Sequence, residues 1–421
     1  MKIQRAYKVE LDPNNRQRTL LEKSAGTARF AYNWALNERI KKYEEDKTIL
    51  SAIDQHKILC SKKKAEYPWM YEVSKCAPQE ALRDLDVAFK NFFRGLKTGQ
   101  KVGFPKFKSK HKSKASFSIS DLKNNMYLTN STISIPKIGT IRLKEKNYIP
   151  TKDVKYNSMT VSKTAGKWFV SVSCEQDIQQ SPVPEVVLGI DLGIKTLAVC
   201  SNGETFENNK YLKKSQKKLA RAQRSLSRKR FDVKTKKSSN NRNKAKKKVA
   251  NIHYKIACQR NDAIHKMTST LVKTKPRYLV LEDLNVKGMM KNHKLAAAVA
   301  DASFYEIRRQ LTYKAGWYGG EIIDIDRWFP SSKRCRICGF IHRDLTLSDR
   351  TFVCPECGHT EDRDGQASMN LEKEGLSTLS SRGIKACGES VRPQGRGPEE
   401  AVSRKQEESK SLIKLNLAKI L

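Results

Sequence analysis

The chain has 421 residues, and its 83 lysines and arginines against 44 acidic residues give a formal charge of +39 at pH 7. This surplus exceeds what solubility requires, so a polyanion is the partner that the composition predicts. With 38% hydrophobic residues, the chain is not globally disordered and is long enough for two to four domains. Its apolar runs are shorter than the roughly 20 residues of a membrane-spanning helix. Residues 1–13 lack the apolar block of a secretion signal, so we expect a cytoplasmic protein without membrane partners.

The first hundred residues predict one strand followed by helices. Apolar and polar side chains alternate from Ile3 to Leu11, which is mostly the period of a half-buried strand, and the pattern ends at Asp12-Pro13. From Arg16 to about Glu45 the apolar spacing becomes helical. A further helix begins at Pro78, since proline is favoured in the first helical turn. Its aromatic residues have helical spacing, which indicates core packing more than base stacking; they are Phe89, Phe92 and Phe93.

Lysines interleave with two aromatic residues between Lys101 and Lys114. Cations with interspersed aromatic rings suit a nucleic-acid backbone and its exposed bases. A solvated linker would also be rich in lysine, so this segment by itself leaves both interpretations open. The residues that we expect to contact nucleic acid here are Phe104, Lys106, Phe107 and Lys108.

The segment from residue 116 to residue 175 returns to strand-forming patterns. Ala165-Gly166 should turn the last two of five strands into a hairpin. With the N-terminal strand, these strands could close a small β-barrel that a helical domain interrupts. The five predicted strands are Phe117–Ser120, Thr132–Pro136, Thr140–Leu143, Ser158–Lys163 and Trp168–Cys174.

Three acidic residues stand at the ends of predicted elements in the second half of the chain. The apolar run that starts at Val186 predicts a buried strand that reaches the surface at Asp191, and a later apolar run ends in the same way at Glu282. Asp364 opens a segment, Ala367 to Leu376, that predicts a short helix. Carboxylates that converge in this way hold hard cations next to a phosphodiester. Each acid alone would be interpreted as a surface residue, but together they predict metal-dependent phosphodiester hydrolysis.

A basic insertion lies between the first of these acids and the second. From Lys210 to Ala250 there are 18 lysines or arginines and a single acid. Leucines recur every seven residues in its first half, and apolar residues form a comparable stripe in the returning half, so residues 210–274 predict a helical hairpin. A charge run is usually a solvated face, but charge this one-sided indicates contact with a duplex backbone. The contact residues that we select are Lys213, Lys217, Arg221, Arg224 and Arg228.

Two CxxC pairs predict a structural zinc site. Fifteen residues separate the pairs, and each pair is followed by glycine. Thiolates spaced in this way occupy one side of a tetrahedral Zn²⁺ from a tight turn, and two such turns complete four sulfur ligands. Four protein ligands leave no open position for a substrate, so we expect one structural and non-catalytic Zn²⁺. Its ligands would be Cys335, Cys338, Cys354 and Cys357.

These segments also carry a family resemblance. In chain order, GIDLGIKTLAV, LVLEDLN and the cysteine pairs followed by DRDGQASMN resemble the split RuvC nuclease of TnpB proteins. That family is transposon-encoded and RNA-guided, and it is similar to type V CRISPR effectors. The resemblance extends from Met1 to about Leu376. One departure is Gln366-Ala367 after the final aspartate, where many relatives have Asn-Ala, and it leaves the acids intact.

The resemblance implies a multidomain α/β fold with an RNase H-like (RuvC) nuclease core. The core would carry the basic helical insertion and the zinc ribbon, and a wedge-type β-barrel split by a helical recognition lobe would precede it. We expect the C-terminal tail to be disordered, because it mixes Ser, Gly, Arg, Pro and Glu without a period. The boundaries are 1–12 and 116–180 for the barrel, 13–115 for the lobe, 185–330 and 362–376 for the nuclease with its insertion at 210–274, 331–361 for the ribbon, and 377–421 for the tail.

The resemblance further implies a transposon-associated DNA endonuclease that a non-coding guide RNA directs to double-stranded target DNA. Asp191, Glu282 and Asp364 would hold two Mg²⁺ or Mn²⁺ ions and hydrolyse the DNA by a two-metal mechanism. The protein would act in the prokaryotic cytoplasm on the nucleoid, as a monomer with its RNA, although the sequence does not define the oligomeric state. The residues that would read a short motif beside the target are Lys75, Gln79, Asn124 and Asn125, for which ordinary polar surface is an equal alternative.

Neighbouring acids complicate the assignment of the site. A strand turns successive side chains to opposite faces, so Glu282 and Asp283 cannot both face the metal ions, and the apolar run and the resemblance favour Glu282. The motif match supports Asp364 over Asp362, which would play a supporting role.

Two other functions remain open at this stage. One is a nucleic-acid-binding transposition accessory or repressor that does not cut, and this is disfavoured because all three acids are present. The other is a guide-independent RNase H-like resolvase, for which the recognition lobe and the basic hairpin would be surplus. A transposon context and a CRISPR context are equally compatible with the sequence.

Overall fold

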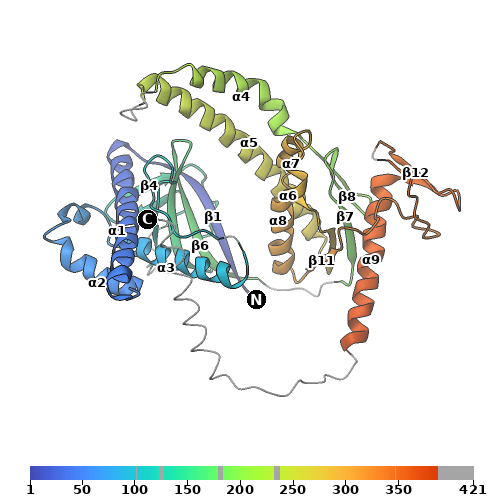
Figure 1. Ribbon diagram of the computed structural model, residues 1–421, viewed down its shortest axis with the longest axis horizontal. Coiled ribbons are helices and arrows are strands. Elements are labelled where there is room, and N and C mark those ends of the chain that lie inside the picture. Colours follow the sequence, from blue (N-terminus) through green and yellow to red (C-terminus); the bar gives the residue numbers. More distant parts are fainter. Residues whose placement is uncertain are drawn as a thin grey trace. The chain divides into compact units, whose positions relative to one another are not determined.

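The computed structural model describes residues 1–386 except 101, 121, 123–127, 179–183, 232–237 and 347 (Figure 1). Within these ranges two compact units are present, one from Lys2 to Asp177 and the other formed by Met1 and the described residues between Ile178 and Ala386. Within the described ranges, no helix combines the length and the apolar character needed to cross a membrane. Two residues predicted to read the target-flanking motif, Asn124 and Asn125, lie outside these ranges.

A six-stranded antiparallel sheet forms the centre of the N-terminal unit. Its strand order is β2-β5-β6-β1-β4-β3, so the N-terminal strand pairs with strands that come more than a hundred residues later. All five strands predicted between residues 116 and 175 are present. In the part of the chain that is described, β2 and β3 are not paired, so closure of the barrel stays a prediction. The bounds are β1 Lys2–Asp12, β2 Ser116–Ile119, β3 Thr132–Ile135, β4 Gly139–Leu143, β5 Val154–Thr164 and β6 Lys167–Asp177.

The β5–β6 hairpin depends on the turn that the sequence predicted. Ala165 and Gly166 have φ angles of 51° and 81°. Positive φ at both central residues is the backbone of a turn whose twist matches that of the flanking strands. The two strands then pair over almost their full length, with Val170 opposite Val161 and, on its other side, opposite Val9 of β1.

Three helices and a 3₁₀ turn complete the N-terminal unit. The side chain of Asn14 accepts a hydrogen bond from the Gln17 N–H (2.9 Å) and the Gln17 side chain accepts one from the Asn14 N–H (3.0 Å), which satisfies two donors at the start of the first helix. Helices and sheet share one hydrophobic core within one compact unit, and the boundary between recognition lobe and barrel stays a prediction. The bounds are α1 Asn15–Asp46, α2 Ala52–Lys63, η1 Pro68–Glu72 and α3 Cys76–Lys97.

A five-stranded sheet organises the second unit. Its order is β11-β10-β7-β8-β9; β11, β10 and β7 run parallel, and β8 and β9 are antiparallel additions joined through a turn at Asn202-Gly203. Because parallel strands end at one edge, Asp191 and Glu282, the last residues of β7 and β10, lie at the same edge. The bounds are β7 Val187–Asp191, β8 Thr196–Cys200, β9 Thr205–Glu207, β10 Tyr278–Glu282 and β11 Glu321–Ile325.

The helices of this unit cover both faces of the sheet. Leu188 and Ile190 of β7 pack with α8 and the end of α5, whereas Val187 of β7 and Val280 of β10 pack with α9 through Leu371. This alternation along each strand produces a three-layer α/β unit. The helix bounds are α4 Tyr211–Ser227, α5 Asn240–Lys273, α6 Val286–Met289, α7 Ala296–Ala302, α8 Phe304–Trp317 and α9 Arg363–Ala386, and a small sheet of β12 Thr351–Val353 and β13 Thr360–Asp362 precedes α9.

Helix α9 is longer than predicted. The sequence analysis placed a short helix at Ala367–Leu376 and a disordered tail from residue 377, but the helix starts at Arg363 and continues to Ala386. The prediction was wrong at residues 377–386, because Leu379 packs against the sheet core and extends the apolar stripe beyond Leu371. The remainder of the predicted tail, 387–421, lies outside the described residues.

Two glycines allow α9 to approach the sheet closely. A Cβ atom built on Gly189 of β7 would lie 2.0 Å from the Ser368 carbonyl oxygen and 2.7 Å from the Glu372 nitrogen, and one built on Gly375 of α9 would lie 2.4 Å from a methyl group of Val280. These distances leave no room for any side chain larger than hydrogen. The backbone of α9 is therefore pressed onto β7, which brings the start of α9 to the edge where Asp191 lies.

We predict that Gly189→Ala lowers the free energy of unfolding by about 1–3 kcal/mol, the usual cost of overpacking, because the added methyl group must push α9 away from β7. Gly316→Ala in α8 is the matched control, since its Cβ would meet no atom within 4 Å and alanine favours a helix. Chemical denaturation of both variants measures the difference. A Gly189→Ala protein as stable as the wild type would contradict the packing described above.

Candidate active site, zinc site and nucleic-acid contacts

Asp191 is the last residue of β7, and its side chain turns to the face of the sheet that α9 covers, as Val187 and Gly189 do. Burial, and then the charges of Asp364 and Glu282, raise the pKa of Asp191 to about 7, while the Arg363 guanidinium acts in the opposite direction. Mutual repulsion of this kind requires that the three carboxyl groups lie close enough to sense one another. The structure thus brings all three predicted catalytic acids to one place.

Glu282 and Asp283 are separated by the strand geometry that the sequence analysis invoked. Glu282 is the last residue of β10, on the face that carries Val280, and burial followed by the charge of Asp283 raises its pKa. Asp283 instead forms ion pairs with Arg327 and with Arg308, the latter at 4.0 Å. Because Arg308 belongs to α8, Asp283 faces the opposite layer. The choice of Glu282 therefore agrees with the geometry.

Asp362 caps helix α9. Its Oδ1 atom accepts hydrogen bonds from the backbone N–H groups of Asp364 (3.1 Å) and Gly365 (2.9 Å). A side-chain acceptor at this position satisfies N–H groups that have no partner in the first helical turn. One carboxylate oxygen of Asp362 is thus used for holding the turn that carries Asp364, which is the supporting role expected for it.

Two arginines beside Asp364 were missed in the sequence analysis. Arg350 Nη1 lies 3.9 Å and Arg363 Nη2 lies 3.5 Å from the Asp364 carboxylate. Arg363 also donates a hydrogen bond to the Thr346 carbonyl oxygen (3.1 Å), which ties the start of α9 to the loop before β12. The alternation of acid and base in Asp362-Arg363-Asp364 was the available signal, because acids this close together need a nearby cation.

The donor set at this edge suits a hard divalent cation. It offers carboxylate oxygens alone, which Mg²⁺ and Mn²⁺ prefer, and the repulsion that raises the pKa of Asp191 is what a bound cation would relieve. In the described residues, the four cysteines are the one group of three or more histidine, cysteine or acidic residues whose ligand atoms all lie within 4.8 Å of each other. The acids are therefore near neighbours with a looser spacing than the cysteines.

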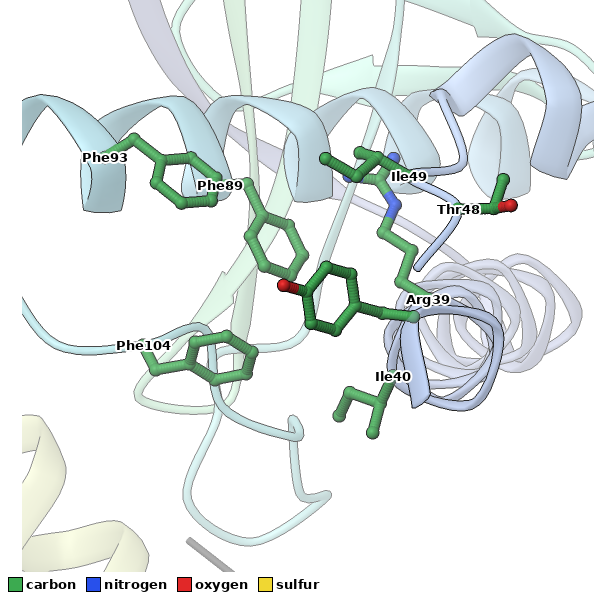
Figure 2. A pocket seen from close by; sticks show the side chains of 8 residues that line it. Arg39, Ile40, Thr48, Ile49, Phe89, Phe93 and Phe104 are labelled. Atoms are coloured by element: carbon green, nitrogen blue, oxygen red, sulfur yellow. The ribbon is translucent and has the colours of Figure 1, made fainter. Parts of the chain in front are cut away.

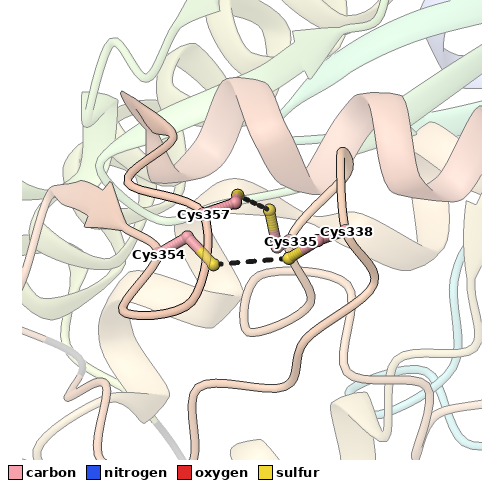
Figure 3. Close-up of side chains that lie close together, drawn as sticks. All are labelled: Cys335, Cys338, Cys354 and Cys357. Atoms are coloured by element: carbon pink, nitrogen blue, oxygen red, sulfur yellow. Dashed lines mark hydrogen bonds between the residues drawn. The ribbon is translucent and has the colours of Figure 1, made fainter.

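The four predicted zinc ligands converge on one point (Figure 3). Cys335 Sγ lies 3.6 Å from Cys357 Sγ, and Cys338 Sγ lies 3.5 Å from Cys354 Sγ. Sulfurs bound to one tetrahedral Zn²⁺ at about 2.3 Å would lie roughly 3.8 Å apart, so the geometry fits this ion. His359 is not needed as a ligand, and its Nε2 atom lies 3.1 Å from Glu361 Oε2 instead.

Each CxxC pair forms a tight turn that aims its sulfurs inward. The Gly339 N–H donates to the Cys335 carbonyl oxygen and the Gly358 N–H to that of Cys354, both at 3.0 Å. The two glycines have φ angles of 80° and 70°, which side-chain-bearing residues rarely adopt. This backbone conformation explains why a glycine follows each CxxC pair.

The basic insertion is a helical hairpin, as predicted. Helices α4 and α5 pack through Leu219 and Ala222 on one side and Ile252 and Ile256 on the other. The five cations selected from the sequence, Lys213, Lys217, Arg221, Arg224 and Arg228, are all exposed and belong to α4 or its C-terminal cap. The apolar seam is structural, and the cationic surface is available to a partner.

The lysine-rich segment divides into buried and exposed positions. Phe104 packs edge-on against Phe89 and Phe92, at ring-centroid distances of 5.4 and 5.5 Å, and lines an apolar pocket with Arg39 and Ile40 (Figure 2). Lys108 lies with its Nζ atom 3.7 Å from the centre of the Tyr32 ring, and burial lowers its pKa.

Phe104 and Lys108 are therefore half-buried, each packed on one side against a ring of α3 or α1, and contact with nucleic acid stays a prediction for both. Lys106 and Phe107 are exposed, and so is Lys75 at the start of α3, whereas Gln79 is half-buried. Contact with nucleic acid stays a prediction for these four residues.

Family models match three parts of the chain. The OrfB_IS605 model, described as "Probable transposase", matches residues 160–293. A model described as "Cas12f1-like, TNB domain" matches residues 304–371, which include the four cysteines, and one described as "Helix-turn-helix domain" matches residues 1–48. The last match covers β1 and the single long helix α1.

The fold is that of Cas12-type effectors. The solved structure of Cas12f1 with sgRNA and target DNA aligns with 88% of this chain and 99% of its own, with a TM-score of 0.52 and 14% sequence identity. The class of protein is thus a multidomain α/β chain with this fold, a cluster of acids at one sheet edge and a four-cysteine site.

Two curated relatives define the family. A protein of Streptomyces pristinaespiralis is 36% identical over 93% of both chains, and InsQ of Escherichia coli (strain K12) is 33% identical over 96% of this chain and 99% of its own. Both carry the name "Putative RNA-guided DNA endonuclease". The chain belongs to their family, which is the TnpB family that its motifs resemble.

We predict that the purified protein holds one Zn²⁺ per chain, and that Cys354→Ser loses it and lowers the stability of the second unit, because the metal joins the two cysteine-bearing turns. Elemental analysis and thermal denaturation measure these effects. Cys258→Ser is the control, since Cys258 is exposed on α5 and distant in sequence from the cluster. Folded, zinc-free wild-type protein would refute the assignment.

For the hairpin, replacing its five selected cations with glutamine should weaken binding to RNA or to an RNA–DNA duplex and flatten its salt dependence. The expected change is up to about 0.9 in log–log slope for each lost phosphate contact. The control replaces five exposed cations of the N-terminal unit, which removes the same charge: Lys137, Arg142, Lys146, Lys152 and Lys155. Equal slopes for the two variants would mean that net charge acts and the hairpin surface does not.

Proposed function

We propose that this protein is an RNA-guided DNA endonuclease that hydrolyses target DNA at the edge of the five-stranded sheet. The observation that carries the proposal is the position of Asp191 at the end of a buried strand, where burial and then the charges of Asp364 and Glu282, from two distant segments, raise its pKa. Such an arrangement destabilises the free protein and is explained if the acids bind cations during the reaction.

Each acid has a defined task in this proposal. Asp191, Glu282 and Asp364 supply the oxygen ligands, and Asp362 holds the turn that positions Asp364. Two Mg²⁺ or Mn²⁺ ions bound there would activate the attacking water and stabilise the leaving oxygen. Water attack of this kind leaves a 3′-hydroxyl and a 5′-phosphate. Zn²⁺ at the four cysteines would be structural, since its sulfur ligands leave no position for substrate.

Binding of the guide and the target is assigned to the basic surfaces. The exposed cations of α4 suit the backbone of a duplex, and their sequence-independent contacts would complement base pairing by the guide RNA, which supplies sequence specificity. The names of the curated relatives support this assignment, and so does the solved Cas12f1 structure, which contains an sgRNA and target DNA. A short motif beside the target would be read by the N-terminal unit, where Lys75 and Gln79 stand at the start of α3.

We predict that protein expressed with its native flanking DNA co-purifies with a structured non-coding RNA and cuts matching double-stranded DNA beside a short motif, in Mg²⁺ or Mn²⁺ but not in EDTA. Asp191→Ala, Glu282→Ala and Asp364→Ala should each reduce cutting more than about 100-fold, because each removes several kcal/mol of charge stabilisation. Binding of RNA and target should be retained.

Two neighbouring acids serve as controls. Asp283→Ala should lose far less activity than Glu282→Ala, because Asp283 faces α8, and Asp362→Ala should be milder than Asp364→Ala. Wild-type protein that binds RNA and target without ever cutting would replace the proposal with a binding-only accessory or repressor. Cutting without any RNA would favour a guide-independent resolvase, and loss of binding in Asp191→Ala would make that residue structural.

A further inference from the structure

Two aromatic side chains of the second unit extend far into solvent. Trp328 is 84% exposed and Tyr305 is 72% exposed, the highest values for aromatic side chains in the described part of the chain. Trp69, the next most exposed tryptophan, reaches 41%. A single exposed apolar residue is common on protein surfaces. The significance of this pair therefore depends on where the two residues lie.

Trp328 follows the edge strand β11, which ends at Ile325. Its backbone N–H donates a hydrogen bond to Asp326 Oδ1 (2.8 Å), and the next residue, Phe329, packs into the core between β10 and α9. The residues on both sides of the Trp328 side chain are thus held in place, while its indole ring remains exposed to solvent. Strand β11 pairs in parallel with β10, with Ile325 opposite Glu282. Trp328 therefore stands at the edge of the sheet that carries the catalytic acids.

Tyr305 reaches the same edge from the first turn of α8. One turn further along the helix, Arg308 forms an ion pair with Asp324 near the end of β11 and lies 4.0 Å from Asp283, the residue after Glu282. The N-terminal end of α8 therefore points toward the ends of β10 and β11. The turn before it is fixed by Ser303, which has a φ of 58° and precedes the helix directly.

Each ring has an arginine close to it in the chain, Arg308 one turn after Tyr305 and Arg327 directly before Trp328. Arg308 and Arg327 both pair with Asp283, and their side chains are 37% and 41% exposed. Arginines whose charge is partly compensated but whose planar groups remain accessible can still contact phosphate or stack on bases. Aromatic rings combined with cations are the arrangement by which proteins hold unpaired nucleic acid, since every base has a face on which a ring can stack.

We propose that Trp328 and Tyr305 form a stacking platform for the bases of the unpaired DNA strand that is cut at the adjacent acids. This inference rests on the proposed function for the identity of the strand. A duplex keeps its bases stacked on one another, so its bases cannot occupy the platform until the strands separate. The platform would therefore admit an opened target strand to the acids and leave intact duplex outside.

Direct binding tests the platform independently of cutting. The probe is a labelled oligothymidylate of about 12 nucleotides, within the usual range of site sizes for single strands, mixed in EDTA with the protein and its co-purified RNA. Trp328→Ala and Tyr305→Ala should each weaken binding about 5- to 100-fold, which corresponds to one lost base stack. Trp328→Phe and Tyr305→Phe should stay close to the wild type because they keep a ring.

Three further measurements separate stacking from a general defect. Tyr71→Ala, which removes a 54% exposed ring from the N-terminal unit, should bind like the wild type. Binding of a duplex of the same length should be unchanged in all variants, and so should the thermal denaturation midpoints. The wild-type tryptophan emission should fall when the oligothymidylate binds, and Trp328→Phe should lose most of that quenching.

The outcomes are distinct. Alanine variants that bind the single strand as tightly as the wild type, or that lose single strand and duplex equally, would overturn the platform. If the platform variants lose binding but the wild type never cuts, the proposed function fails and the platform stands. If the wild type cuts and the alanine variants bind and cut normally, the platform alone fails.

Discussion

The contact between the α9 backbone and Gly189 is the constraint on which the candidate site depends. Asp191 and Asp364 are 173 positions apart in the chain and become neighbours because α9 lies directly on β7. A helix normally packs on a sheet through side chains. Here the missing side chain of Gly189 lets the helix backbone itself touch the strand, and this places the first turn of α9 beside the last residue of β7.

Placing acids this close together is electrostatically unfavourable, and neighbouring groups reduce the repulsion between them. The pKa of Asp191 is raised to about 7 by burial and by its two acidic neighbours, with Arg363 acting against them. Arg350 and Arg363 lie beside Asp364, and Asp362 uses an oxygen to cap the helix. Nearby cations and backbone donors thus partly neutralise the acids. The site still favours additional positive charge, although the formal charge of the chain is already +39.

The sequence predicted the features that depend on local pattern. Period-two alternation separated Glu282 from Asp283, and the structure agrees, because one faces α9 and the other pairs with Arg308 of α8. The cysteine spacing correctly predicted the four-sulfur cluster, because the tight turn of each CxxC pair is determined by residues within the pair and the glycine that follows it.

The predictions that failed required knowledge of tertiary packing. The partial burial of Phe104 against α3 and of Lys108 against Tyr32 of α1 could not be predicted from the lysine-rich segment, because it depends on rings outside that segment. Helix α9 continues past Leu376 because Leu379 packs against the core of the sheet. The composition of this segment, rich in serine and glycine, gave no indication of that contact. Arg350 was missed for a similar reason, because only the pairing of β12 with β13 brings it beside Asp364.

The four-cysteine site bears on the acids through α9. Asn370, which is buried on this helix, donates hydrogen bonds to the carbonyl oxygens of Ser331 (2.8 Å) and Arg334 (2.6 Å), and Arg334 directly precedes Cys335. On the other side, Arg363 holds the loop before β12 through Thr346. The cysteine-bearing segment is therefore attached to α9 both at the helix start and two turns later. A metal that fixes this segment also fixes the turn carrying Asp364, so a structural ion without substrate contact can still determine the geometry of the cutting site.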